Sequence, residues 1–337
     1  MSMPAARTNG KLSRAPFLQP IDSELLRVEA LLREELSSVV QTAFAASRHI
    51  LDAGGKRLRP SLVILSAKAC EQDCDTSRVV AIAAAVEMIH MATLMHDDVI
   101  DGADSRRGRR TASSFWGNQV SVLTGDYMLS KATSLFGRDG DIRLIQTLSE
   151  ATISMTEGEI RQIEFQGNTD ALSDQYLSII SDKTAEFMSA CCRLGVIVAG
   201  GSPEAGAALG AYGLNLGLAF QITDDLLDLI GDPEVTGKPV GGDIREGKIT
   251  LPIILALEKA STSDRARVEE IVHGDGASAG DIEFIRQLVH DADAEEGTRS
   301  IAADYIKRAI ENLNALPESE YRTSLEDLAR LILRRKK

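Results

Sequence analysis

The feature that most constrains this chain is a pair of uncharged apolar runs that end in the same acidic pattern. Asp97-Asp98-Val99-Ile100-Asp101 follows residues 88–95, and Asp224-Asp225-Leu226-Leu227-Asp228 follows residues 214–223. Runs of this kind belong in buried helices, and residues four apart share a helix face, so Asp97 and Asp101 can reach one cation. Carboxylates crowded at the ends of buried helices repel one another unless cations intervene. We therefore expect helices whose acidic ends bind metal.

Magnesium fits these carboxylates best, because it is a hard ion that prefers oxygen ligands and commonly bridges to phosphates. No twelve-residue calcium loop with a closing glutamate is present. Zinc would normally recruit histidine or cysteine, and only His90 and His96 are near the first motif. We expect Mg²⁺ as the cofactor.

Helical periodicity covers nearly the whole chain, and no segment has a convincing strand pattern. Glycine-rich breaks at residues 54–55, 137–140, 167–170 and 200–203 separate the helices. The expected helices span residues 21–51 (as one or two helices), 62–69, 79–100, 112–136, 142–165, 173–199, 203–230, 251–259, 265–272, 279–292, 295–315 and 319–334. We predict an all-α fold, a multi-helix bundle around a central cavity, for which the low aromatic content of 4% leaves room.

The net charge of −13 argues against nucleic acid or an anionic membrane as the main partner, because both would repel such a surface. No run of about 18 uncharged apolar residues suggests a spanning helix, although peripheral membrane contact stays open.

Residues 1–20 have the composition of a mobile tail, and we expect residues 21–337 to form a single helical domain. The tail lacks the apolar centre of a signal peptide, and an organelle transit segment is a minor alternative. The four cysteines lack metal-ligand spacing and are expected to be buried, reduced thiols. These features favour a cytoplasmic setting.

Basic residues stand where they could bind phosphate. Lys56 and Arg59 lie beside a glycine break before the start of a helix, which could form an anion-binding site. Arg106 and Arg107 follow the first acidic motif and offer forked donors to phosphate oxygens. Further candidates to hold phosphate or developing charge, each ordinary alone, are Lys183, Thr184, Gln221 and Lys238. No nucleophile elbow, Cys/His pair or glycine-rich nucleotide loop is present, so the chemistry must come from metals, cations and an apolar cavity.

Together these residues resemble the trans-polyprenyl diphosphate synthase family, whose members have the isoprenoid synthase fold. The motifs occur in the family's order between about residues 25 and 322, and the pattern is closest to medium- and long-chain members such as octaprenyl diphosphate synthases. They are GGKRLRP at residues 54–60, MIHMATLMHDDVID at 88–101, RRG at 106–108, GD at 125–126, KT at 183–184, FQITDDLLD at 220–228 and GKPVGGDIREGKITLP at 237–252.

The resemblance implies a role for each motif residue. Magnesium ions that chelate an allylic diphosphate would be bound by Asp97, Asp101 and Asp224, and Arg106 would hold the same diphosphate. Isopentenyl diphosphate would be held by Lys56, Arg59, His90 and Arg107. The leaving diphosphate would be steadied by Lys183, Thr184, Gln221 and Lys238. The resemblance also implies a homodimer.

Product length depends on what lines the cavity beneath the metal site. Thr93 lies one helical turn before Asp97, with Ala92 beside it, so both are candidates to line this cavity. Short-chain members of the resembling family carry bulky aromatic residues near this position. The small side chains here predict an all-trans polyprenyl product of medium or long chain. Alternatively, residues deeper in the cavity, near Met128, close it and limit the product length.

Three other functions compete with this prediction. A short-chain synthase making farnesyl or geranylgeranyl diphosphate would use the same chemistry. A non-catalytic partner subunit would be expected to have a degraded site, whereas the motifs here are intact. A terpene cyclase shares the fold, but its second metal motif normally mixes Asn, Ser/Thr and Glu, unlike the repeated DDxxD. A plain bundle with acidic helix ends explains one acidic motif better than it explains two.

Overall fold

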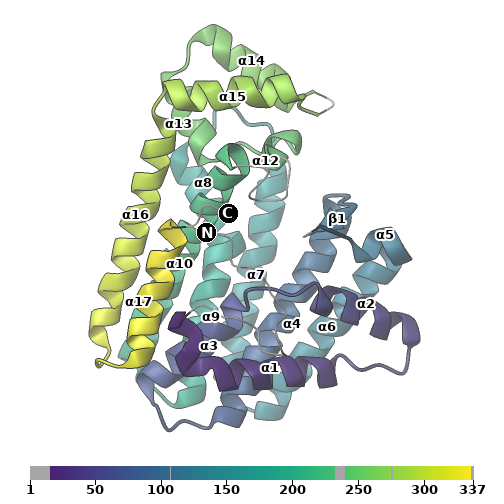
Figure 1. The fold of residues 1–337 in the computed structure, drawn as a ribbon, viewed down its shortest axis with the longest axis vertical. Coiled ribbons are helices and arrows are strands. Elements are labelled where there is room, and N and C mark those ends of the chain that lie inside the picture. The colour runs from purple at the N-terminus through teal and green to yellow at the C-terminus, as the bar shows by residue number, and fades with distance from the viewer. Residues whose placement is uncertain (1–15, 107, 232–239, 275, 335–337) are drawn as a thin grey trace.

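The computed structural model describes residues 16–106, 108–231, 240–274 and 276–334. These residues form a helical bundle in which long helices stand side by side and shorter helices cover one end (Figure 1). Six helices of this bundle are α3 (Leu58–Cys70), α4 (Thr76–Ile100), α6 (Asn118–Asp139), α7 (Ile142–Glu164), α9 (Glu186–Ala199) and α10 (Pro203–Ile230). The prediction of an all-α fold is confirmed.

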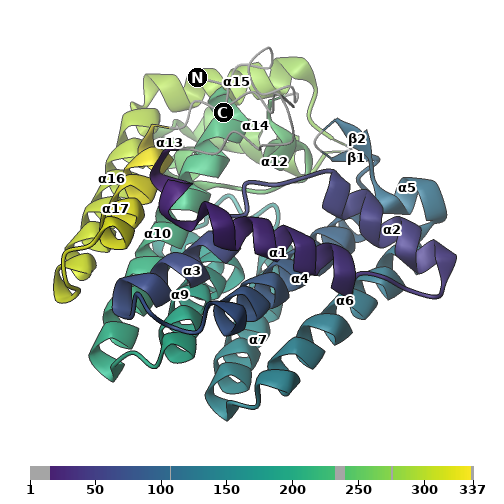
Figure 2. The same cartoon turned by 60° about the horizontal axis from the view of Figure 1, so that its bottom comes forward.

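The remaining helices pack around these six, and Figure 2 shows α1 running across the bundle. At the N-terminal end they are η1 (Pro16–Ile21), α1 (Asp22–Glu35), α2 (Gln41–Asp52) and α5 (Ala112–Trp116). Further along the chain they are α8 (Ser173–Ile180), η2 (Ser181–Ala185), α12 (Gly242–Arg245), α13 (Leu251–Lys259), α14 (Thr262–Val272), α15 (Ala279–Asp291), α16 (Ala294–Asn312), η3 (Leu313–Ala315) and α17 (Glu320–Leu333). Residues 16–20, which we expected in the N-terminal tail, lie in η1, where Leu18 is buried.

The two helices that carry the acidic motifs have well-defined starts. The Asp75 carboxylate accepts hydrogen bonds from the backbone N–H groups of Ser77 and Arg78 at the start of α4. Ser202 caps α10 in the same way, and Pro203 occupies its first turn, where no backbone donor is needed. Capping fixes where each helix begins, and therefore where its acidic end projects.

Buried apolar residues form two clusters, and α10 belongs to both. One cluster surrounds α3, α4 and α9, and includes Tyr212 and Leu216 of α10. The other lies under α13 to α16, and includes Ile222 and Leu229 of α10. The helix that carries the second acidic motif therefore joins the two parts of the core.

Both motif helices are long and apolar enough, by length and composition, to cross a membrane. About 72% of the most apolar window of α4 and 50% of that of α10 is buried inside the protein. Core helices pass the same test, and both helices contribute side chains to the core clusters described above.

The structure corrects several predicted boundaries. The helix expected over residues 112–136 is broken at Gly117, whose φ of +82° ends α5 and starts α6. The next break falls at Gly140 alone, because Gly137 lies inside α6. The structure also contains a short hairpin that no strand pattern in the sequence indicated, in which β1 (Ser105–Arg106) pairs antiparallel with β2 (Arg109–Arg110).

Candidate active site

The first acidic motif forms the C-terminal end of α4, where its three aspartates differ in exposure. Asp98 is only 3% exposed, and its Oδ1 accepts a hydrogen bond from Arg106 Nε of the hairpin at 2.6 Å. Asp101 is exposed at the helix end, and Asp97 is intermediate. The ion pair turns Asp98 away from solvent, which leaves Asp97 and Asp101 on the accessible side.

Burial and nearby charges of both signs act on the ionisation of Asp97. Burial, followed by Glu159 of α7, raises the pKa of Asp97 to about 6, against the opposing effects of Lys183 and Arg106. Partial burial and Glu246 likewise raise the pKa of Asp101, against the effect of Lys248. Because both carboxylates resist ionisation in this environment, a cation bound between them would be favoured.

The second motif forms the end of α10 and has a similar division of exposure. Asp224 is exposed, whereas Asp225 is 7% exposed and both of its oxygens accept hydrogen bonds. Tyr176 donates its hydroxyl to Oδ2 at 2.7 Å, and Gln221 donates Nε2 to Oδ1 at 2.7 Å. Thr184 donates to the Gln221 carbonyl at 3.0 Å, so two predicted site residues belong to the network that holds Asp225.

The third aspartate of this motif binds the segment that follows it. Asp228 Oδ2 accepts the backbone N–H of Asp243 at 3.0 Å, at the start of α12. Burial, followed by Asp225 and Asp228, raises the pKa of Asp243 well above its usual range. The second motif therefore gathers four carboxylates, since Asp243 joins its three aspartates.

Lys248 is a cation that acts on both motifs. Burial works to lower its pKa, but Glu246, at 2.5 Å from its ammonium group, Asp101 and Asp243 together raise the pKa above its ordinary value. Since Asp101 ends α4 and Asp243 lies against the end of α10, the two acidic motifs face a common space.

The donor set around this space suits a hard divalent cation, because every acidic group offers oxygen alone. Within the described residues, no three acidic, histidine or cysteine side chains come close enough together to hold a metal by themselves. A bound cation would therefore complete its coordination with oxygens from a ligand or from water. Such a site fits a metal that arrives with a diphosphate.

Lys183 lies in a π-helical turn, η2, that interrupts the helix expected over residues 173–199. Its ammonium group lies 2.6 Å from Glu159 Oε2 and also donates to Gln162, both on α7. A Cβ on Gly158 would come within 2.5 Å of the Lys183 backbone nitrogen, so this position requires glycine. The close approach of α7 to η2 sets where Lys183 points.

The basic segment before α3 separates into structural and accessible cations. Arg57 has a left-handed backbone conformation (φ +49°), is 7% exposed, and is ion-paired with Glu29 at 2.6 Å and Glu87 at 2.8 Å. Lys56 is exposed. Burial lowers the pKa of Arg59, and its buried Nε finds no acceptor within the described part of the chain. An unsatisfied buried guanidinium donor is the kind of group that an anionic ligand would satisfy.

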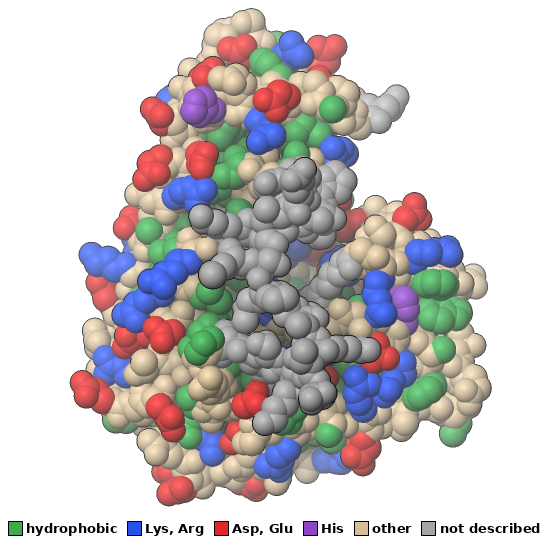
Figure 3. Space-filling view, in the orientation of Figure 1, with side chains coloured by type: hydrophobic (Ala, Val, Ile, Leu, Met, Phe, Trp, Pro, Cys, Tyr) green, Lys and Arg blue, Asp and Glu red, His purple; other side chains and the backbone are tan. Residues whose placement is uncertain are grey.

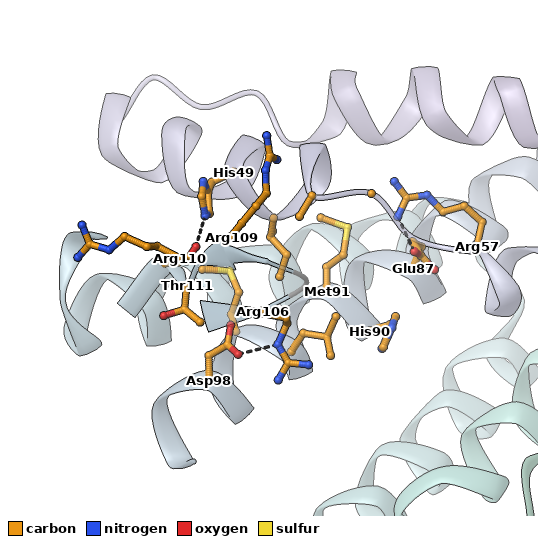
Figure 4. Close-up of a pocket in the computed structure, with 16 residues that line it drawn as sticks. His49, Arg57, Glu87, His90, Met91, Asp98, Arg106, Arg109, Arg110 and Thr111 are labelled. Atoms are coloured by element: carbon orange, nitrogen blue, oxygen red, sulfur yellow. Dashed lines mark hydrogen bonds and ion pairs between the residues drawn. The ribbon is translucent and has the colours of Figure 1, made fainter. Parts of the chain in front are cut away.

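A pocket lies between the C-terminal end of α2, α4 and the hairpin (Figure 4). The room inside it is small, about 30 Å³, and His90, Asp98 and Arg106 are among the residues that line it. The space-filling view shows that this face is indented between the α14–α15 end and the part formed by α2, α5 and the hairpin (Figure 3). His49 of α2 also lines the pocket, and its Nε2 bonds to the carbonyl of Arg110 at 2.7 Å.

The two predicted chain-length residues differ in exposure. Ala92 is completely buried, and Thr93 is partly exposed. The Thr93 hydroxyl donates to the carbonyl of His90 at 2.9 Å, so it is occupied by the helix backbone. Arg107 and Lys238 lie outside the described residues.

Sequence reasoning missed several residues of this region, and Asp243 is one of them. Tyr176 and Glu159 stand alone in ordinary helical segments, and no signal in the sequence marked them. Lys248 lies within the GKPVGGDIREGKITLP motif, which was recognised without a role for this lysine. Arg57 stands between the two basic residues that were chosen, and the sequence could not distinguish it from them.

Comparison with known proteins agrees with this geometry. A family model described as polyprenyl synthetase matches residues 40–289. A short chain isoprenyl diphosphate synthase of Methanothermobacter thermautotrophicus is 37% identical over 312 residues, covering 90% of this chain and 94% of that protein. The octaprenyl diphosphate synthase of Escherichia coli is 36% identical over 312 residues, covering 93% and 96%.

A solved structure extends the match to the fold. The polyprenyl synthase of Caulobacter crescentus, complexed with calcium and isoprenyl diphosphate, superposes with a TM-score of 0.91 at 35% identity, covering 98% of this chain and all of that one. With the family model matching most of the chain and two relatives above 35% identity, the chain belongs to the polyprenyl synthetase family and is a trans-prenyltransferase.

Proposed function

We propose that this enzyme condenses isopentenyl diphosphate with an allylic diphosphate, in the presence of Mg²⁺, and releases an all-trans polyprenyl diphosphate of medium or long chain. The observation that carries the proposal is the meeting of two acidic helix ends around one space, with Lys183 and Lys248 beside them. Two oxygen-rich clusters and flanking cations match the charge of a metal-bound diphosphate.

The allylic diphosphate would bind between the two motifs. Asp97, Asp101 and Asp224 would hold the magnesium ions, and these are accessible carboxylates while Asp98 and Asp225 are buried. Magnesium would neutralise the charge that builds up on the leaving diphosphate. Calcium in the Caulobacter crescentus structure is a divalent ion with the same preference for oxygen ligands.

The chain's own cations would complete the binding of both substrates. Arg106, now bound to Asp98, still has guanidinium donors that could reach a diphosphate on the accessible side. Lys183 would steady the leaving group, assisted by Lys238, while Thr184 and Gln221 would act through the network that holds Asp225. Isopentenyl diphosphate would be held by Lys56, Arg59, His90 and Arg107, of which Arg59 has the unsatisfied buried donor.

In this reaction the carbon–oxygen bond of the allylic diphosphate breaks, and the double bond of isopentenyl diphosphate attacks the allylic cation. Loss of a proton, which the released diphosphate would accept, then gives an allylic product that is ready for another addition. The chain's role is to orient both substrates and to exclude water, which would otherwise quench the cation. The apolar α4 side chains Met91, Leu94 and Met95 line the pocket beside His90 and supply part of this dry surface.

A product of medium or long chain is favoured by the small side chains of Ala92 and Thr93. Overall identity does not decide the length, since the short-chain and octaprenyl relatives match almost equally well. The test is to incubate the purified protein with an allylic primer, labelled isopentenyl diphosphate and Mg²⁺, and to size the dephosphorylated products. Products longer than geranylgeraniol are expected. If the longest product is geranylgeraniol, the enzyme is the short-chain alternative.

We also propose a homodimer in the cytoplasm. Large apolar side chains are exposed along α6 and α7, where a second copy could cover them, as on Leu123 (67% exposed), Ile153 and Ile160. The four cysteines are free, which agrees with a reducing compartment, although only Cys191 and Cys192 are buried as expected and Cys70 and Cys74 are partly exposed. Sedimentation velocity tests the assembly: the wild-type protein should sediment as a dimer, and Leu123→Glu should shift it toward monomer. A monomeric wild-type protein would contradict the proposal.

A further inference from the structure

The buried aspartate of the second motif is held by a residue from outside the seven motifs quoted above. Tyr176 lies on α8 and is separated by 49 positions from Asp225, yet its hydroxyl lies 2.7 Å from Asp225 Oδ2. Tyr176 is 5% exposed and Asp225 is 7% exposed, so water does not compete for this bond. With Gln221 on the other oxygen, both carboxylate oxygens are directed into the protein.

The equivalent aspartate of the first motif is held differently. Asp98 is bound by the guanidinium of Arg106, a cation that cancels much of its charge. Asp225 is bound by a phenol and an amide, which are neutral. Neutral donors fix the orientation of a carboxylate but leave its charge in place, so the field that attracts a cation to the second motif is preserved.

The Tyr176 phenol stays protonated at this position and can therefore act as a hydrogen-bond donor. Burial, followed by the nearby Asp225, raises the pKa of Tyr176 well above its usual value, so the hydroxyl keeps its proton throughout the physiological range. Within the described residues, the Tyr176 hydroxyl donates to Asp225. Without this donor, only the hydrogen bond from Gln221 would hold the orientation of the Asp225 carboxylate.

We propose that Tyr176 is a positioning residue for the second metal-binding motif. By holding Asp225 inward without neutralising it, Tyr176 keeps the exposed Asp224 on the accessible face of α10. The inference rests on the proposed function, in which Asp224 binds magnesium together with the allylic diphosphate. It assigns Tyr176 no contact with the substrate.

The test uses Tyr176→Phe, which removes one oxygen and keeps the ring. The matched control is Tyr212→Phe, because Tyr212 is also fully buried and donates its hydroxyl at 2.8 Å, but to the backbone carbonyl of Leu325 in α17. Thermal unfolding of both variants measures the cost of losing a buried hydroxyl. Calorimetry with inorganic diphosphate and Mg²⁺ measures the metal–diphosphate site without requiring turnover.

Tyr176→Phe is expected to weaken binding of inorganic diphosphate with Mg²⁺ by about 10-fold, the size of effect expected from one hydrogen bond to a charged group. Tyr212→Phe should bind like the wild-type protein even if it is equally destabilised. In turnover assays, the KM for the allylic substrate and the Mg²⁺ requirement should rise for Tyr176→Phe, with the KM for isopentenyl diphosphate unchanged.

Two results would overturn the inference: unchanged metal–diphosphate binding in Tyr176→Phe, or equal weakening in both variants. The proposed function fails separately, if the wild-type protein binds diphosphate with Mg²⁺ but forms no prenyl chain. In that case the calorimetric comparison still decides the role of Tyr176.

Discussion

The ammonium group of Lys183 lies 2.6 Å from the Glu159 carboxylate, and both groups act on Asp97. Glu159 comes from α7, Lys183 from the π-helical turn η2, and Asp97 from the end of α4. Glu159 raises the pKa of Asp97, while Lys183 lowers it. A cation that binds Asp97 therefore enters a site in which the negative charge of Glu159 and the positive charge of Lys183 already oppose each other.

Replacing Glu159 with glutamine should shift the pH dependence of catalysis. Asp97, with a pKa of about 6, must lose its proton to bind metal, so activity at limiting Mg²⁺ should rise as the pH increases through about 6. Removing the Glu159 charge lowers this pKa, and we expect the acid limb of the pH profile to move down by about 0.5–1 unit. Glu157→Gln, an exposed neighbour on α7, is the control and should leave the profile unchanged. An upward or absent shift in Glu159→Gln would contradict this account.

Replacing Asp97 with asparagine should abolish activity and also make the protein more stable at neutral pH. The folded-state pKa of Asp97 is raised, so the folded protein binds its proton more tightly than the unfolded chain does. The contribution of Asp97 to stability is therefore greatest at low pH and is lost as the pH rises through about 6. At pH 7 we expect Asp97→Asn to raise the free energy of unfolding by about 1–2 kcal/mol, after allowing for partial solvent screening. Chemical denaturation at pH 4.5 and pH 7 measures the change in the free energy of unfolding. An equal change at the two pH values would contradict the predicted pH dependence.

The structure explains which parts of the site could be predicted. Helical spacing alone indicated that Asp97 and Asp101 share a face, and Asp98 does lie on a different side of α4, bound to Arg106. The inward direction of Asp225 depends on Tyr176, 49 positions away, and local spacing carries no information about such a contact. Residues in the motif helices were therefore predictable, whereas the residues that orient them were not.

Replacing Gly158 with alanine should impair catalysis through Lys183. The added Cβ would lie 2.5 Å from the Lys183 backbone nitrogen and 3.0 Å from the Asp182 carbonyl carbon, so α7 and η2 must separate. We expect a loss of about 1–3 kcal/mol in stability and a fall of at least about 10-fold in kcat. Gly206→Ala is the matched control, because its Cβ would meet only a Val196 methyl group at 3.9 Å. Denaturation and steady-state kinetics distinguish the variants, and equal behaviour would argue against the close approach.

Replacing Thr93 with phenylalanine should shorten the product. The larger ring would occupy space one turn before Asp97, where we expect the growing chain to pass. Thr133→Phe is a control on the exposed face of α6, where the threonine hydroxyl also bonds to its own helix backbone. Product sizing by chromatography measures the outcome. An unchanged distribution in Thr93→Phe would move the length determinant elsewhere, for example toward Met128.

The basic segment shows why residue type was not enough to assign roles. Lys56, Arg57 and Arg59 were equally plausible phosphate ligands by residue type. In the structure, however, Arg57 is ion-paired with Glu29 and Glu87, which are 28 and 30 positions away. Its left-handed backbone conformation at the start of α3 could not be read from the residue itself. The break at Gly117 and the two-residue strands are similar, because each depends on a local backbone conformation that apolar periodicity does not report.

The central claim is that the two acidic motifs act as one metal–diphosphate site, and a double-mutant cycle on Asp97 and Asp224 tests it most directly. Turnover of an allylic diphosphate with labelled isopentenyl diphosphate and Mg²⁺ would be measured for Asp97→Ala, Asp224→Ala and the double variant, with circular dichroism to confirm folding. Each single variant should lose most of its activity, and the double variant should lose little more, because the motifs act as a unit. Near-native turnover in either single variant, or losses that simply multiply, would contradict the claim.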